Sequence, residues 1–138
     1  MRAEVFLDTN ILLYAISTAR EEAAKKRTAR ELLARTNWGL SVQVLQEFYV
    51  NAIRAAPRPA MSHAHAVAAI QEFLHRPVAI LDSSLLLAAL ELKARYQLSY
   101  WDSAIVAAAR SIDAATLYSE DLGDGQTYGS VTVQNPFA

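Results

Sequence analysis

The chain has 138 residues, of which 53% are hydrophobic and 20% are charged, and this is the composition of an ordered protein with one hydrophobic core. We therefore expect one domain that spans residues 1–138. The absence of cysteine excludes disulfides, thiolate zinc sites and cysteine nucleophiles, and a formal net charge of −1 gives no broad attraction for nucleic acid.

The first half of the chain alternates short β-type runs with helical periodicity. The expected elements, in order, are a strand at 4–7, a helix at 11–16, a surface helix at 21–35 and a strand at 38–40. The next helix has Val44, Leu45, Phe48 and Ile53 on one apolar side, and we expect it to end before Pro57.

The second half repeats this alternation. Ser62 is the expected N-cap of a helix that runs through Leu74, because a serine at this position satisfies free backbone N–H groups. The remaining expected elements are a strand at 78–81, helices at 85–96 and from Trp101 to Ile112, and strands at 116–118 and 131–133.

Strands that alternate with helices favour an α/β fold with a mainly parallel central sheet flanked by helices, because parallel strands need crossover connections. Ligand sites in such sheets lie beyond the carboxyl ends of the strands. Asp8 and Asp121 each follow a predicted strand directly. A site is therefore expected at this edge of the sheet.

No apolar segment predicts a membrane span or an export signal. The runs 85–90 and 104–109 are far shorter than the roughly 20 residues that cross a bilayer. Asp8 and Asn10 interrupt the apolar N-terminal stretch before a signal-peptide core can form. We therefore expect a cytoplasmic protein that does not bind membranes.

Four acidic residues are candidates for a common site: Asp8, Glu47, Asp102 and Asp121. Three of them also have structural explanations, because an aspartate caps a helix, stabilises a helix N-terminus or initiates a turn. Glu47 lies among apolar neighbours, where a buried carboxylate without a partner costs several kcal/mol. A cation is a reasonable partner for it.

Convergence of these four carboxylates would require compensation of their charge. At a separation of about 5 Å and an effective dielectric near 20, each pair repels by roughly 3 kcal/mol. Protonation relieves this in part, whereas Mg²⁺ or Mn²⁺ does so more completely and can activate water against a phosphodiester. Thr9 and Asn10 can then orient Asp8 or a water molecule on the metal, and Ser119 can contact a ligand oxygen.

The same motifs, in the same order, resemble PIN-domain proteins and specifically the VapC toxins of toxin–antitoxin modules. The resemblance is nearly end to end. It is carried by Phe6-Leu7-Asp8-Thr9-Asn10-Ile11-Leu12-Leu13-Tyr14, Gln46-Glu47-Phe48-Tyr49, Trp101-Asp102, Ser119-Glu120-Asp121-Leu122 and Asn135-Pro136-Phe137.

This resemblance implies a PIN-like three-layer sandwich and a metal-dependent endoribonuclease. Its expected cofactor is Mg²⁺ or Mn²⁺, and its expected partners are RNA, a cognate antitoxin polypeptide and a second copy of the chain. The implied catalytic and metal-binding residues are Asp8, Glu47, Asp102 and Asp121. Two positions depart from the family pattern, since Ser119 replaces a frequent threonine and Gly123 replaces a frequent aspartate. Glu120 and Asp124 are therefore alternative metal ligands.

Two other functions remain open at this point. A non-catalytic PIN-fold module would hold RNA or a protein without cleaving it. An aspartyl-phosphate phosphatase would use Asp8 as its nucleophile, although Asn10 stands where those enzymes have an acid. Lys25, Lys26, Arg27 and Arg30 can contact RNA phosphates or an acidic partner, but a solvated helix face is the simpler interpretation.

Overall fold

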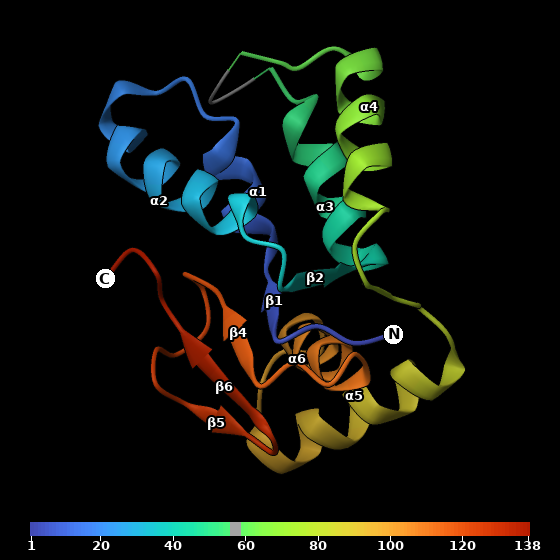
Figure 1. Cartoon of the computed structure of the whole chain (residues 1–138). Coiled ribbons are helices and arrows are strands. Elements are labelled where there is room, and N and C mark those ends of the chain that lie inside the picture. The colour runs from blue at the N-terminus through green and yellow to red at the C-terminus, as the bar shows by residue number, and fades with distance from the viewer. Residues whose placement is uncertain (56–58) are drawn as a thin grey trace.

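The computed structural model describes residues 1–55 and 59–138 (Figure 1). Its central sheet has the strand order β3-β2-β1-β4-β6-β5, and only the β5–β6 pair is antiparallel. The expected mainly parallel sheet is therefore confirmed. The strands are β1 (Val5–Leu7), β2 (Trp38–Ser41), β3 (Val78–Ala79), β4 (Thr116–Tyr118), β5 (Thr127–Tyr128) and β6 (Val131–Gln134).

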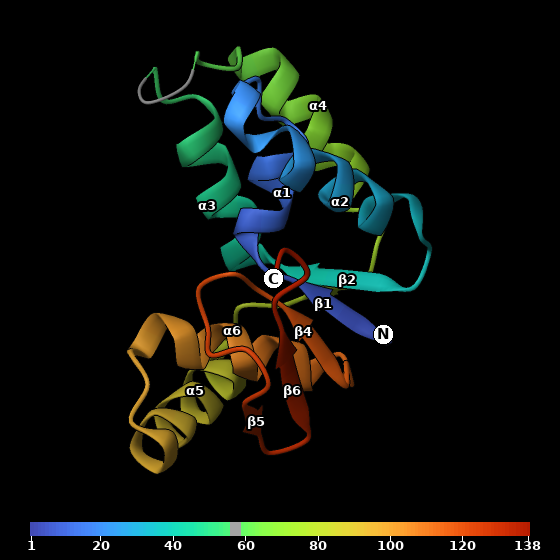
Figure 2. The same ribbon diagram turned by 90° about the vertical axis from the view of Figure 1, so that its left-hand side faces the viewer.

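Helices cover both faces of this sheet. In Figures 1 and 2, α1 to α4 lie together on one side of the sheet, and α5 and α6 lie together on the other. This is the three-layer arrangement that the sequence resemblance implied. The helices are α1 (Thr9–Ala15), α2 (Ala23–Ala34), α3 (Val42–Ala52), α4 (His63–Phe73), α5 (Ser83–Tyr96) and α6 (Tyr100–Ser111).

Three local details differ from the sequence-based prediction. The pattern missed β5, because a two-residue strand carries no periodicity. A 3₁₀ turn at Arg20–Glu22 precedes α2, so the α-helix begins two residues later than expected. Strand β3 ends at Ala79, two residues earlier than expected. Helix α3 ends at Ala52, before Pro57 as expected, and Pro57 itself lies outside the described residues.

Helix α6 is buried because small side chains let it lie between the sheet and α5. Seven consecutive residues, 103–109, are buried, and four of them are alanines. It contacts β2, β3, β4 and β6 on one side and packs along α5 on the other. This packing holds the N-terminus of α6, which carries Asp102, near the sheet.

In the described part of the chain, no helix has the length and apolarity needed to cross a membrane.

Candidate functional site

Asp8 lies where β1 ends and α1 begins. It is the N-cap of α1, and its Oδ1 accepts a hydrogen bond of 2.7 Å from the Thr9 backbone N–H. Strands β1 and β4 are parallel neighbours, so Leu7 lies beside Tyr118 and Asp8 lies beside Ser119. The Ser119 hydroxyl donates a 2.8 Å hydrogen bond to Asp8 Oδ2. Asp8 can therefore cap α1 and still take part in a site at the carboxyl edge of the sheet.

The charge of Asp8 is poorly compensated. Its side chain is only 7% exposed, and burial raises its pKa to about 6. Hydrogen bonds from Ser119 and Thr9 lower the pKa, whereas the charges of Asp121 and Glu47 raise it further. Neither of the ion pairs found among the described residues involves Asp8. A carboxyl in this environment favours binding of a proton or a cation.

Glu47 extends from α3 toward the start of α1. Its Oε2 accepts 2.9 Å from the Thr9 hydroxyl, and its Oε1 accepts 2.9 Å from the Gln43 amide. Neutral donors thus provide partners for this half-buried carboxylate, and a cation as a further partner of Glu47 remains a prediction. Thr9 joins both acids, because its N–H binds Asp8 while its hydroxyl binds Glu47.

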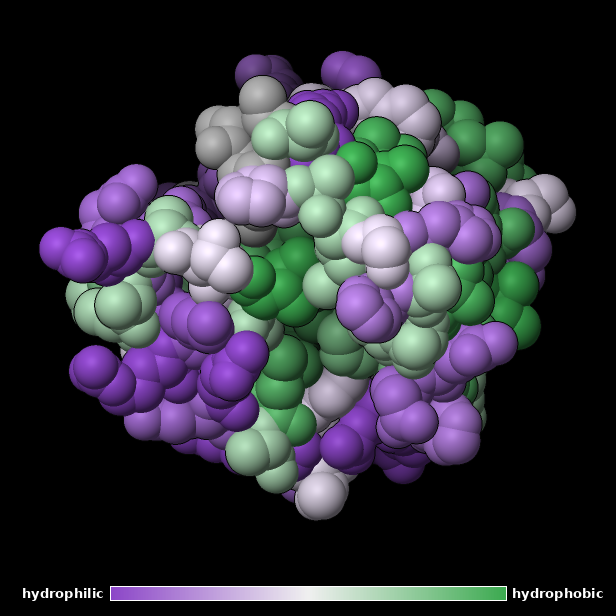
Figure 3. All heavy atoms as spheres, turned by 90° about the horizontal axis from the view of Figure 1, so that it is seen from above, coloured by the Kyte–Doolittle hydropathy of each residue, from purple (hydrophilic) through white to green (hydrophobic). Residues whose placement is uncertain are grey.

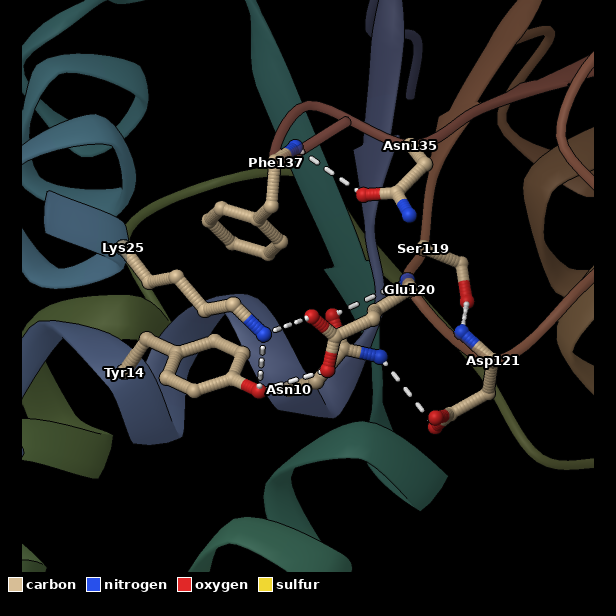
Figure 4. Close-up of polar contacts among 8 residues, drawn as sticks. All are labelled: Asn10, Tyr14, Lys25, Ser119, Glu120, Asp121, Asn135 and Phe137. Atoms are coloured by element: carbon tan, nitrogen blue, oxygen red, sulfur yellow. Dashed lines mark hydrogen bonds and ion pairs between the residues drawn. The ribbon is translucent and has the colours of Figure 1, made fainter. Parts of the chain in front are cut away.

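Asp121 reaches the same region from the loop after β4 (Figure 4). Its Oδ2 accepts a 3.2 Å hydrogen bond from the Asn10 amide, and its backbone N–H donates 3.1 Å to the Ser119 hydroxyl. The side chain is exposed, so solvent reaches it. Asn10 therefore orients Asp121 and not Asp8, while Ser119 contacts both acids.

Asp102 approaches from the opposite side of the sheet, in the first turn of α6. Its backbone N–H donates to the Ser99 hydroxyl at 3.1 Å, but no described residue donates a hydrogen bond to its carboxylate. The buried Gln43 amide lies 2.9 Å from Glu47 Oε1 and 3.5 Å from the Trp101 carbonyl oxygen. Gln43 therefore connects Glu47 to the first turn of α6, which carries Asp102. The sequence motifs did not indicate Gln43, although it lies one helical turn before Glu47.

The donor chemistry of this region suits a hard divalent cation. Carboxylate, hydroxyl and amide oxygens gather there, and these are ligands that Mg²⁺ and Mn²⁺ prefer. No three acidic or histidine side chains of the described residues stand close enough to share one ion. Glu47 points to Thr9 and Gln43, and Asp121 points to Asn10. Binding one ion through all of these carboxylates would require Glu47 and Asp121 to exchange neutral partners for the metal.

The two alternative ligands suggested by the sequence are held elsewhere. Glu120 accepts hydrogen bonds from Lys25 and Tyr14, both at 2.5 Å. Asp124 Oδ1 accepts 2.8 Å from the Asn135 backbone N–H and so closes a turn. Each carboxylate therefore has a structural partner. Asp8, by contrast, has only neutral donors, and the Asp102 carboxylate accepts no hydrogen bond from a described residue.

The family comparison covers most of the chain. The model of a family described as the PIN domain matches residues 5–123. No curated protein matches the sequence.

Several solved structures share the fold at low sequence identity. A toxin–antitoxin complex from Klebsiella pneumoniae superposes with a TM-score of 0.69 and 18% identity, over 96% of this chain and 97% of that one. The toxin VapC20 of Mycobacterium tuberculosis, described as cleaving the sarcin–ricin loop, has a TM-score of 0.66 and 24% identity, over 85% and 89%. DNA-bound VapBC of Salmonella typhimurium has a TM-score of 0.69 and 15% identity, over 97% and 98%.

Proposed function

This chain belongs to the PIN-domain family, and from that membership we propose that it is a metal-dependent endoribonuclease, the toxin of a toxin–antitoxin pair. The observation that carries the proposal is the buried Asp8 carboxylate, which no cation of the described chain balances. Structural neighbours described as a sarcin–ricin loop cleaving toxin and as toxin–antitoxin complexes support the choice of reaction and role.

In the proposed site, Asp8, Glu47 and Asp102 would hold Mg²⁺, or Mn²⁺, which accepts the same ligands. Asp121 would complete the ligand set or place the attacking water. When bound, the ion would supply Lewis-acid polarisation of the phosphodiester and activation of water. No protein base is then required.

The chain's own residues provide the orientation. Ser119 and Thr9 each donate one hydrogen bond to a different oxygen of Asp8, which fixes the plane of that carboxylate. Thr9 and Gln43 do the same for Glu47. Carboxylates oriented in advance lose little freedom when they bind a ligand.

Two rival functions make different use of these residues. A non-catalytic module would bind RNA or protein without any need for a buried, unbalanced carboxylate. A phosphatase with an Asp8 nucleophile would need an acid near the leaving group, and Asn10 instead donates to Asp121. Cleavage of RNA that depends on both metal and Asp8 separates the proposed function from both rivals.

The proposed protein partners are a cognate antitoxin and a second copy of the chain, in the cytoplasm. Large exposed hydrophobic side chains support such contacts. Seen from the end formed by α1 to α4, hydrophobic residues gather in the middle of the surface, and hydrophilic ones lie along the side of α2 (Figure 3). The exposed large hydrophobic residues on or beside α3 and α4 include Val50 and Leu74. Those on or beside α5 and α6, on the other side of the sheet, include Ile80, Leu81, Leu87, Leu90 and Trp101.

The test is cleavage of total cellular RNA by the purified chain in Mg²⁺, in Mn²⁺ and in chelator. We expect cleavage that chelator abolishes and that Asp8→Asn lowers by at least about a hundredfold, because the amide cannot supply the charge. Glu91→Gln is the matched control, since Glu91 is an exposed carboxylate on α5. Full activity of Asp8→Asn contradicts the proposal. RNA binding without cleavage in every condition favours the non-catalytic module.

A further inference from the structure

The basic residues at the start of α2 do not form one solvated face. The partly exposed Lys25 side chain reaches Glu120, and its Nζ lies 2.5 Å from Glu120 Oε2 and 3.2 Å from the Tyr14 hydroxyl. Arg30 donates from Nε to the Ala15 carbonyl oxygen at 2.9 Å. The neighbouring Lys26 makes no hydrogen bond or ion pair with any described residue. Lys25 is thus set apart from Lys26 by its partners.

Glu120 is held at both carboxylate oxygens. Tyr14 donates to Oε1 and Lys25 donates to Oε2, so α1 and α2 each supply one donor (Figure 4). The Phe137 ring covers this group, because it packs edge-on against Tyr14 at 4.9 Å between centroids and lies 5.8 Å from Lys25 Nζ. We call Tyr14, Lys25, Glu120 and Phe137 the clamp.

The clamp connects directly to Asp121. The Glu120 backbone N–H donates 3.3 Å to Asn10 Oδ1, and the Asn10 amide donates 3.2 Å to Asp121 Oδ2. The backbone N–H groups of Asp121 and Leu122 both donate to the Ser119 hydroxyl. In Figure 4 the Glu120 side chain extends toward Lys25 and Tyr14, and the Asp121 side chain extends toward the Asn10 amide. Fixing one side chain therefore limits the directions open to the next.

We propose that Lys25 is a positioning residue for the metal site. Together with Tyr14 it anchors Glu120, and through the peptide link and Asn10 it keeps the Asp121 carboxylate facing the region of Asp8. This inference rests on the proposed function, because it assigns Lys25 to the cation affinity of the same site. Lys25 itself contacts neither the metal nor the RNA.

The sign of a charge effect distinguishes positioning from direct electrostatics. Lys25 repels a cation nearby, so removing its positive charge would by this electrostatic effect alone strengthen cation binding. Loss of the clamp weakens it, because Asp121 becomes free to turn into solvent. The two explanations therefore predict opposite changes in Mn²⁺ affinity for Lys25→Met.

The experiment measures Mn²⁺ binding by the electron paramagnetic resonance signal of the free ion, with the full chain purified without antitoxin. We expect Lys25→Met to raise the Kd for Mn²⁺ about tenfold, and Lys25→Arg to restore it to within about threefold. Lys26→Met is the matched control and leaves the Kd unchanged. An unchanged or lower Kd in Lys25→Met, or an equal rise in Lys26→Met, overturns the proposal.

The kinetics give a second decision. Lys25→Met should raise the Mg²⁺ concentration needed for half-maximal RNA cleavage about tenfold, while kcat at saturating Mg²⁺ stays within about threefold. A phosphate-binding role for Lys25 predicts instead a higher KM for RNA at saturating Mg²⁺ with unchanged metal affinity. That result replaces the positioning role with substrate binding.

Hydrogen exchange keeps the inference testable if the proposed function fails, which wild-type protein would reveal by binding no Mn²⁺. The amides of Glu120, Asp121 and Leu122 all donate to side chains of this network. We expect them to exchange about tenfold faster in Lys25→Met while the buried amides of α6 are unchanged. Unchanged exchange at these three amides overturns the clamp itself.

Discussion

The Asp8 end and the Glu120 end of one hydrogen-bonded network differ in how the fold balances a negative charge. At Glu120 burial raises the pKa, but hydrogen bonds from Lys25 and Tyr14 outweigh it and leave the pKa lowered. At Asp8 burial dominates, two acids add to it, and the pKa rises to about 6. One network of acids therefore contains carboxylates with a structural role and carboxylates with a proposed functional role. A carboxylate whose negative charge has no nearby cation, such as Asp8, marks the expected cation site.

The largest expected difference between the two ends is in catalysis. Asp8→Asn should lower RNA cleavage by at least about a hundredfold at any Mg²⁺ concentration, because it removes a ligand. Glu120→Gln should lower it about tenfold at limiting Mg²⁺ and much less at saturation, because the carboxylate acts only through the position of Asp121. Titration of cleavage with Mg²⁺ separates these outcomes. Equal losses at saturation would break the distinction between a ligand and a positioning residue.

The second difference is in the pH dependence of stability without metal. The folded pKa of Asp8, about 6, lies above the ordinary aspartate value of 3.8, so ionisation of Asp8 opposes folding. The protonated Asp8 carboxyl contributes fully to the free energy of unfolding below about pH 4. This contribution is lost as pH rises through about 6, and the loss lowers the free energy of unfolding by about 3 kcal/mol. Asp8→Asn removes this loss, and its free energy of unfolding should exceed that of wild type in chelator at pH 7.5.

Urea denaturation from pH 4 to 7.5 in chelator measures this effect. Asp82→Asn is the matched control, because Asp82 caps α5 as Asp8 caps α1, and asparagine is an equally good cap. Because Asp82→Asn retains Asp8, its free energy of unfolding should fall between pH 4 and 7.5 as that of wild type does. A profile of Asp8→Asn that is parallel to wild type would show that the Asp8 charge is balanced after all.

The third and smaller difference is the stability provided by the clamp. Glu120 has a lowered pKa, so its contribution is present above the pKa of an unfolded glutamate and is lost as pH falls through the folded value. Glu120→Gln should reduce the free energy of unfolding at pH 7.5 by about 1 kcal/mol, since Lys25 is partly exposed. An increase in stability, as expected for Asp8→Asn, would place Glu120 with the functional acids.

The smallest effect is expected at Asp124. Its carboxylate accepts one backbone hydrogen bond, and the carbonyl of asparagine can accept the same bond. Asp124→Asn should therefore change the free energy of unfolding by less than about 0.5 kcal/mol and leave the Mg²⁺ dependence of cleavage unchanged. A loss of metal affinity in this variant would make Asp124 a ligand and would change our assignment of the late acid.

Much of the fold was predictable because its signals are local. Hydrophobic periodicity indicated five of the six strands and all six α-helices, and the missed strand β5 has two residues. The cap residue Ser62 was also predictable, since a cap acts within three residues of itself. The family motifs located the candidate acids, and these remain proposals for the metal ligands.

The partners of those acids were not predictable in the same way. Lys25 was expected on a solvated helix face and Glu120 was an alternative metal ligand, whereas the structure pairs the two side chains across 95 positions of the chain. The role of Gln43 was not predicted either; its amide lies between Glu47 and the Trp101 carbonyl oxygen, next to Asp102. Both features depend on how α2, α3 and α6 pack against other elements.

The sequence by itself therefore determined the order and type of the elements, and placed Asp8 at the end of a strand, because periodicity and capping act over a few residues. The tertiary structure decided which acids have partners. Asn10 reaches Asp121 across 111 positions, and Ser119 reaches Asp8 across the same separation, because β1 and β4 are neighbours in the sheet. Charge balance depends on distance in space, so only the folded chain distinguishes the balanced Glu120 from the unbalanced Asp8.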